Sequence, residues 1–130
     1  MKPITENPHF ARIDRAPFEI GRLLQRMPEV FSAYLPVEPD HRLLGEAVAQ
    51  HADNANQTLL SGLEALGHVL QVAANNKEWA VDADQISRLG GLIVHLAVEA
   101  QFLQEVESNF RYAIDADDKR QGKSGNAKAQ

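Results

Sequence analysis

The sequence contains no cysteine. A disulfide scaffold, a catalytic thiol and a thiolate metal site are therefore excluded, and the composition fits a reducing compartment. Residues 1–14 combine charged side chains with two prolines and hold no apolar core, so they do not form a secretory signal. No stretch reaches the roughly 18 uncharged apolar residues of a transmembrane helix. We therefore expect a soluble, cytoplasmic protein that does not bind a membrane.

Basic residues are in the minority: the chain has 13 Lys and Arg against 18 Asp and Glu, a net charge of −5. Residues 1–116 hold nine basic and sixteen acidic side chains, a balance of −7, whereas residues 117–130 hold four and two, a balance of +2. Phosphate contacts dominate the affinity of proteins for nucleic acids. An acidic body therefore argues against direct nucleic-acid binding.

Recognisable catalytic motifs are also lacking. The sequence shows no catalytic triad, zinc motif or helix-turn-helix pattern. Gly90 and Gly91 do not make a phosphate loop, because no lysine or serine follows at the required spacing and no strand precedes them. We expect these glycines to admit the backbone of another helix, with Gly62 and Gly67 as partners. The sequence thus predicts no cofactor, no metal and no enzymatic activity.

What the sequence does contain is helical periodicity. From residue 40 to about residue 74, apolar or small side chains recur at alternating steps of four and three, which is typical of a paired left-handed helix. They are Val48, Ala52, Ala55, Leu59, Gly62, Leu66, Val69 and Ala73.

A second long helix begins at a well-defined signal. Asp82 is a candidate N-cap, and Gln85 can complete a capping box with it. Val81 and Ile86 have the spacing of a hydrophobic staple. We expect this helix to run from residue 82 to about 114, with an apolar seam formed by Leu89, Leu92, Leu96, Leu103, Phe110 and Ile114.

The two ends of the chain are less regular. Residues 1–15 are expected to form an extended or partly disordered arm. Pro17 is well placed in the first turn of a short helix, and Pro28 should end that helix. Residues 116–130 have no apolar periodicity and are expected to be disordered. The helical domain would then span residues 16–115.

The lengths of the helices predict the architecture. At 1.5 Å per residue, each long helix measures roughly 50 Å. A connector of under ten residues forces the two helices to lie antiparallel. We therefore predict an all-α fold, a long antiparallel hairpin of residues 40–74 and 82–114 with a short N-terminal helical segment.

The stretch from residue 89 to residue 103 is apolar almost all the way round, so it must be covered on every side. The helices within one chain are too few to cover it. A second copy of the chain is the simplest cover, because two-fold dimers are the commonest oligomers. We predict a homodimeric helical bundle whose interface includes Val94, His95, Val98, Glu99, Phe102 and Tyr112.

Two Glu–His pairs have the i,i+4 spacing that places both side chains on one helix face. His95 in its apolar stretch needs a polar partner if buried, and Glu99 can supply it. We interpret this pair as an interface histidine with its partner, and a proton-transfer pair or pH-sensitive interface is the functional alternative. Helical bundles hold metals with Glu and His, although their motif is one residue shorter. A metalloenzyme using His95, Glu99 and Glu64 therefore remains an alternative.

Trp79, in the loop between the long helices, and the pair Glu64 and His68 are candidate partner-binding residues. An exposed tryptophan can anchor a partner, although it can also cap the end of a bundle. The expected function is a non-enzymatic protein–protein interaction module that acts as adaptor, regulator or inhibitor. One version is an anti-CRISPR-like inhibitor encoded by a mobile element, whose acidic surface occupies a nucleic-acid groove. An apolar small-ligand binder is a further alternative.

Overall fold

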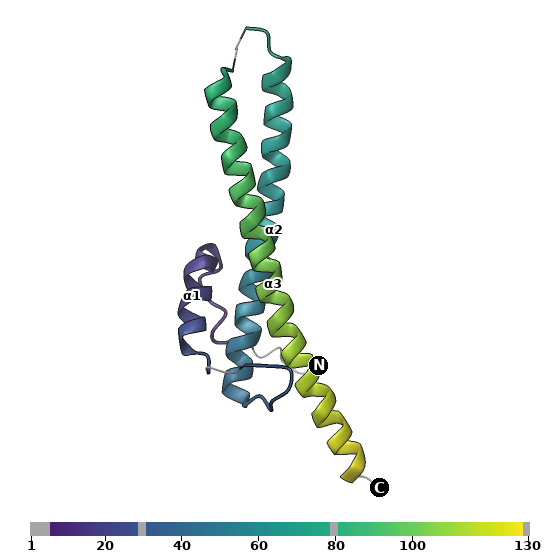
Figure 1. Ribbon diagram of the computed structural model, residues 1–130. Coiled ribbons are helices and arrows are strands. Elements are labelled where there is room, and N and C mark those ends of the chain that lie inside the picture. Colours follow the sequence, from purple (N-terminus) through teal and green to yellow (C-terminus); the bar gives the residue numbers. More distant parts are fainter. Residues whose placement is uncertain (1–5, 29–30, 79–80, 129–130) are drawn as a thin grey trace.

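The computed structural model describes residues 6–28, 31–78 and 81–128. It contains a short 3₁₀ helix, η1 (Ile13–Arg15), and three α-helices: α1 (Ala16–Arg26), α2 (Pro39–Asn75) and α3 (Ala83–Lys128). No strand occurs within these ranges. The predicted all-α fold is confirmed (Figure 1).

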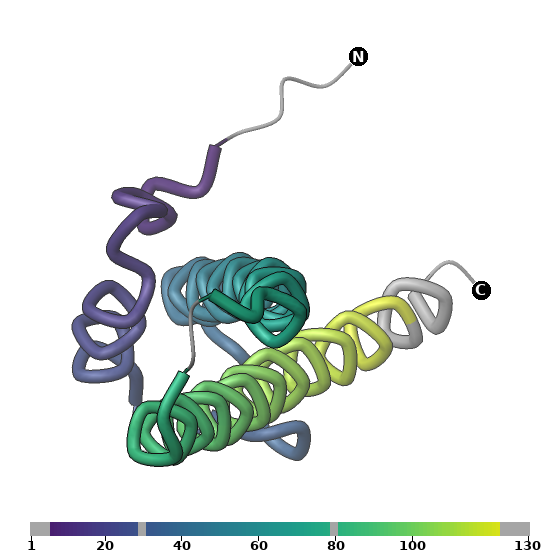
Figure 2. The backbone as a smooth tube through the Cα atoms, turned by 90° about the horizontal axis from the view of Figure 1, so that it is seen from above, coloured from purple at the N-terminus to yellow at the C-terminus, as the bar shows by residue number. Residues whose placement is uncertain are grey.

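α2 and α3 form the predicted antiparallel hairpin, and α1 lies beside only one half of it (Figure 1). Viewed along the hairpin, α1 stands to one side of α2 (Figure 2). α1 packs mainly on α2 rather than on α3. We call the half that α1 accompanies the proximal half and the half that ends at the tip the distal half. Three helices are therefore present in the proximal half and two in the distal half.

Local signals place the helix ends where the sequence predicts. Pro17 lies in the first turn of α1, where its missing N–H costs nothing. Met27, before Pro28, adopts an extended backbone and ends that helix. At the start of α3, the backbone N–H of Gln85 donates to the Asp82 carboxylate at 2.8 Å, and the N–H of Asp82 donates to the Gln85 side chain at 3.3 Å. The predicted capping box is thus confirmed.

The buried core lies where the three helices meet. Its members come from α1, from the first half of α2 and from the middle of α3. Burying a Val- to Phe-sized side chain stabilises a fold by roughly 1.5–3 kcal/mol, so this cluster is the main apolar contribution to stability. The cluster consists of Ile20, Leu23, Leu44, Ala47, Val48, Ala52 and Leu103.

In the distal half, the predicted seam is correct at Leu59, Leu66 and Ala73 of α2 and wrong at the two positions between them. Leu63 and Leu70 are half-buried against α3, whereas Gly62 and Val69, which were predicted in the seam, are exposed. In α3, the predicted seam residue Leu92 is likewise 48% exposed. Neighbouring rows on a helix can both follow steps of three and four, and the position of the partner helix decides which row is buried.

The predicted close approach of helices at glycines is wrong within this chain. A Cβ built at Gly62, Gly67, Gly90 or Gly91 would meet nothing within 4 Å. Gly45 differs, because a Cβ there would lie 2.8 Å from the ring of Phe31. The glycines of the distal half are therefore not needed to let the backbones of α2 and α3 approach each other closely.

The C-terminal segment differs from the disorder predicted for residues 116–130, because α3 continues to Lys128. Asp117 is buried and accepts the backbone N–H of Val37 at 3.1 Å. Arg120 donates to the carbonyl of Leu35 at 2.6 Å. These polar contacts attach the segment to the connector before α2. Because the contacts are polar, the segment shows no apolar periodicity from which the helix could have been predicted.

The N-terminal arm, predicted to be extended or partly disordered over residues 1–15, packs on α2 in the part that is described. The side-chain amide of Asn7 donates to the carbonyl of Leu43 at 2.8 Å, and Phe10 lies against His51 with ring centroids 4.7 Å apart. These contacts leave α1 and the arm on the same side of α2.

Candidate functional site

The distal half of the hairpin exposes an unusual amount of apolar surface. Eight large apolar side chains are between 48% and 71% exposed there. Soluble monomers rarely expose contiguous apolar patches larger than a few hundred Å², and such patches mark binding sites. The eight residues are Leu60, Val69, Val72, Ile86, Leu92, Val94, Val98 and Phe102.

One of these surfaces continues the face that α1 covers in the proximal half. On α2, His51 contacts Phe10, and Asn54 donates to the carbonyl of Ile13 at 3.5 Å. Thr58 lines a hollow beside the start of α1. The next residues on this strip, at steps of four and three, lie beyond α1 and are exposed: Gly62, Ala65, Val69 and Val72.

α3 contributes to the same face. Glu99 lines the hollow that Thr58 lines, so both residues point to the side of the hairpin where α1 lies. His95 and Leu92 precede Glu99 by one and two turns and are exposed. We define the distal face as Gly62, Ala65, Val69 and Val72 of α2 together with Leu92 and His95 of α3.

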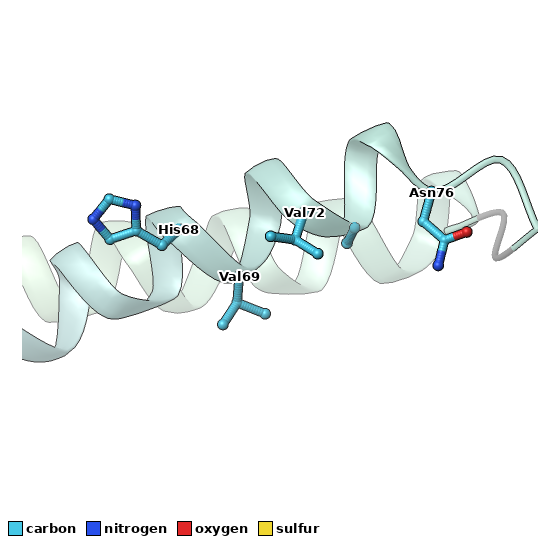
Figure 3. Close-up of a pocket in the computed structure, with 5 residues that line it drawn as sticks. His68, Val69, Val72 and Asn76 are labelled. Carbon is cyan, nitrogen blue, oxygen red and sulfur yellow. The ribbon is translucent and has the colours of Figure 1, made fainter.

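A hollow lies at each end of the distal face. The hollow near the tip has a volume of about 490 Å³ and is formed by one stretch of α2 that includes Val69 and Val72 (Figure 3). The hollow at the α1 end has a volume of about 410 Å³ and lies between the start of α1 and the hairpin. Its apolar lining is Ile13, Ala16, Pro17, Ala55 and Leu59.

The six residues predicted as one dimer interface lie on two strips of α3. Val94, Val98 and Tyr112 are 58% to 67% exposed. They face away from α2, because Val98 lies midway between Leu96 and Ala100, which both face α2. His95, Glu99 and Phe102 lie toward the side of the hairpin that carries α1. No partner chain is present, so the interface stays a prediction.

The predicted partner-binding residues are placed in part. The imidazole Nε2 of His68 lies 3.8 Å from the Glu64 carboxylate, and both side chains are more than 70% exposed on the side of α2 away from α3. Trp79 lies outside the described residues. His68 also lines the hollow near the tip together with Val69 and Val72, so the pair is accessible to a partner at the edge of the distal face.

The arrangement of the described residues does not support the metal-binding alternative. Within the described ranges, no group of three or more His, Asp or Glu side chains gathers closely enough to hold a metal ion. His95 and Glu99 lie toward α1, and Glu64 projects from α2 on the side away from α3. The three residues named for a metalloenzyme are therefore not brought together.

The structure singles out a histidine that the sequence did not. His51 is completely buried, and neither ring nitrogen has a hydrogen-bond partner among the described residues. Burial lowers the pKa of His51, while the nearby Glu19 carboxylate and the backbone of His9, which lies outside hydrogen-bond geometry, oppose the shift in part. In the sequence, the one feature that could have indicated the burial of His51 is its position between Val48 and Ala52 on the buried side of α2. A neutral buried imidazole without a ligand indicates a structural residue.

α3 also bears on the expectation that no stretch can span a membrane. Within it, Ala83–Gly122 is long and apolar enough to cross one by length and composition, and 6% of its most apolar window is buried. We predicted no transmembrane helix here because the stretch is interrupted by a charged residue. Length and composition alone are weak grounds for a membrane helix.

Comparison of the chain with protein families, with curated proteins and with solved structures finds no match.

Proposed function

We propose that this protein is a non-enzymatic protein–protein interaction module that binds through the distal half of its hairpin. The observation that supports the proposal is the set of eight large apolar side chains exposed on a segment of only two helices. Covering such side chains stabilises a complex, because each removes apolar area from water. The module would act in the cytoplasm as an adaptor, regulator or inhibitor of another protein.

The character of this surface supports binding rather than catalysis. The distal face has His95 as its one titratable side chain, with His68 beside it at the hollow near the tip, and Val94 and Val98 are themselves apolar. Apolar, uncharged surfaces of this kind are used for recognition, whereas active sites need convergent polar groups. Inhibition of a nucleic-acid enzyme is one form of the proposal, since the net charge of −5 suits a groove built for phosphates.

Photo-crosslinking in the native cell tests the proposal. A photoreactive amino acid is placed at Val98, with a matched variant at Gln71, which is exposed on the side of α2 away from the distal face. We expect one defined crosslinked protein from position 98 and none from position 71. The substitution Val98→Glu should abolish capture of that protein by the native surface. Equal crosslinking from both positions, or none from either, would contradict the proposal.

A further inference from the structure

The distal face is the unfilled part of a helical bundle. α1 occupies the place of a third helix over the first half of α2, and its start lies level with Asn54 and Thr58. From Thr58 to the end of α2 at Asn75, about 25 Å of helix has no neighbour on this side. We infer that a second copy of this chain covers the distal face, antiparallel to the first, so that two hairpins form a four-helix bundle. The inference rests on the proposed function, because it identifies one partner of the proposed interaction module as a second copy of the same chain.

The exposed apolar side chains supply about half of the apolar area that a standard dimer interface uses. A fully exposed side chain between Val and Phe in size presents roughly 60–120 Å². Five such residues on or beside the distal face, each about half exposed, present on the order of 250 Å². A standard interface uses about 500 Å² of apolar area per partner, so these five supply half, and the small residues and His95 add to it. The five are Ile13, Val69, Val72, Leu92 and Phe102.

The position of α1 decides the orientation of the second copy. Two hairpins packed face to face in parallel would bring their α1 helices to the same end of the same interface. Since helices pack 8–10 Å apart, the two α1 helices would then occupy one space. In the antiparallel arrangement, each tip lies against the start of the other α1. The hollow beside Ile13 then receives the partner's tip, where Val72 is 71% exposed.

The far side of α2 from Ala65 is polar and does not suit this contact. Glu64 and Gln71 lie there, about 100° and 120° around the helix from Ala65, and both are exposed. The distal face of α2 instead carries Gly62 and Ala65, whose small side chains let another helix approach closely. A two-fold axis near Ala65 would place these small residues at the centre of the interface.

A lipid bilayer fits the same face less well than a second copy does. α3 is paired with α2 along the distal half, so a membrane that took in α3 would also take in Glu64 and His68. Ionisable side chains in the hydrocarbon core cost several kcal/mol each, and the 3.8 Å contact between His68 and Glu64 offsets only part of that cost. Membrane binding is therefore an outcome that the experiments below distinguish.

Cysteine crosslinking tests the contact directly, because the natural chain has no cysteine. Ala65→Cys near the two-fold axis should form a covalent dimer with a short bis-maleimide, whereas Gln71→Cys, at an exposed position about 120° around α2 from Ala65, should not. A mixture of Thr58→Cys and Val72→Cys chains should form the mixed dimer in preference to either pure one, as an antiparallel arrangement requires. Equal crosslinking at positions 71 and 65, or pure Thr58→Cys dimers, would overturn the inference.

Light scattering of the full chain completes the test. The wild-type protein should be dimeric at micromolar concentration, and Ala65→Glu should raise the dimer dissociation constant about 100-fold or more, since it buries an unpaired charge. Gln71→Glu, at an exposed position on the far side of α2, should leave the dissociation constant unchanged. A monomeric wild-type chain overturns the inference but leaves the proposed function to the photo-crosslinking result. Flotation with vesicles, or dissociation by Val98→Glu and not by Ala65→Glu, also overturns it.

Discussion

His51 is the residue whose environment differs most from water. It is fully buried between the N-terminal arm and α2, with the ring of Phe10 against it and no hydrogen-bond partner in the described part of the chain. Burying a polar group without a partner costs free energy. The neutral ring is the form that this site tolerates, and the fold is therefore coupled to pH through one side chain.

Acidification should weaken the fold through His51. Because burial holds its folded pKa below the ordinary value of 6.5, the unfolded chain takes up a proton first as the pH falls. The free energy of unfolding should therefore be highest above pH 6.5 and decrease below it. Urea unfolding at fixed protein concentration, compared at pH 7.5 and pH 5.5, measures the change. His51→Leu should reduce the decrease and His68→Leu, at an exposed position, should not; an identical decrease in all three proteins would refute this assignment.

Glycines at two positions of α2 should respond oppositely to alanine. A methyl group at Gly45 meets the ring of Phe31 at 2.8 Å, and Phe31 is held by Phe110 at a centroid distance of 5.1 Å. Gly45→Ala should thus lower the free energy of unfolding by about 1–3 kcal/mol. Gly67 has open space around it, so Gly67→Ala should raise that free energy by up to about 1 kcal/mol. Urea titration gives both values, and a stabilising Gly45→Ala would show that the ring moves freely.

At the scale of elements, polar contacts join the C-terminal part of α3 to the connector before α2. Arg42 makes a bidentate ion pair with Asp118, which holds the pKa of that carboxylate below its ordinary value. Asp117, one residue earlier, is buried and binds the connector backbone at Val37. Exposed ion pairs contribute little to stability, so the buried carboxylate is the more important of the two contacts.

Removal of the Asp117 side chain should therefore destabilise the base of the hairpin. Asp117→Ala leaves the N–H of Val37 without its partner, at a cost of about 1–3 kcal/mol. Thermal unfolding and amide exchange of residues 35–42 should both report the loss. Asp115→Ala, at an exposed neighbouring position of α3, is the matched control and should change neither quantity. Equal effects of the two substitutions would mean that the carboxylate does not hold the connector.

At the scale of the whole molecule, stability should vary along the hairpin. The proximal half holds the buried core, and the distal half has only the α2–α3 seam. Regions with few buried apolar contacts open more readily. The distal half should therefore be the less stable part of an isolated chain.

Amide hydrogen exchange at two protein concentrations tests this difference. At submicromolar concentration, amides of residues 60–73 and 86–98 should exchange faster than those of residues 44–52. At high concentration, the distal amides should become protected, because association covers the distal face. Ala65→Glu should show fast distal exchange at both concentrations. Protection that is uniform along the hairpin and independent of concentration would contradict the unequal stability.

The candidate site was predictable in its existence but not in its outline. The excess of apolar residues from 89 to 103 already predicted an apolar surface that the chain's own helices do not cover. Whether Val69 or Leu70 lies in the seam of α2 depends on where α3 packs, and both rows follow the same steps along the sequence. The residues predicted as a single interface on α3 therefore lie on two strips, because α1 lies on only one side of the hairpin.

Local sequence signals account for the helix ends and for the hairpin. Pro17 and Pro28 bound α1, the Asp82 capping box starts α3, and the lengths of two helices with a short connector require an antiparallel hairpin. The face of the hairpin that α1 covers, and the continuation of α3 as a helix beyond Ala116, become evident only in the folded chain. Those features depend on contacts between residues far apart in the chain, such as Val37 with Asp117, and no local pattern encodes such contacts.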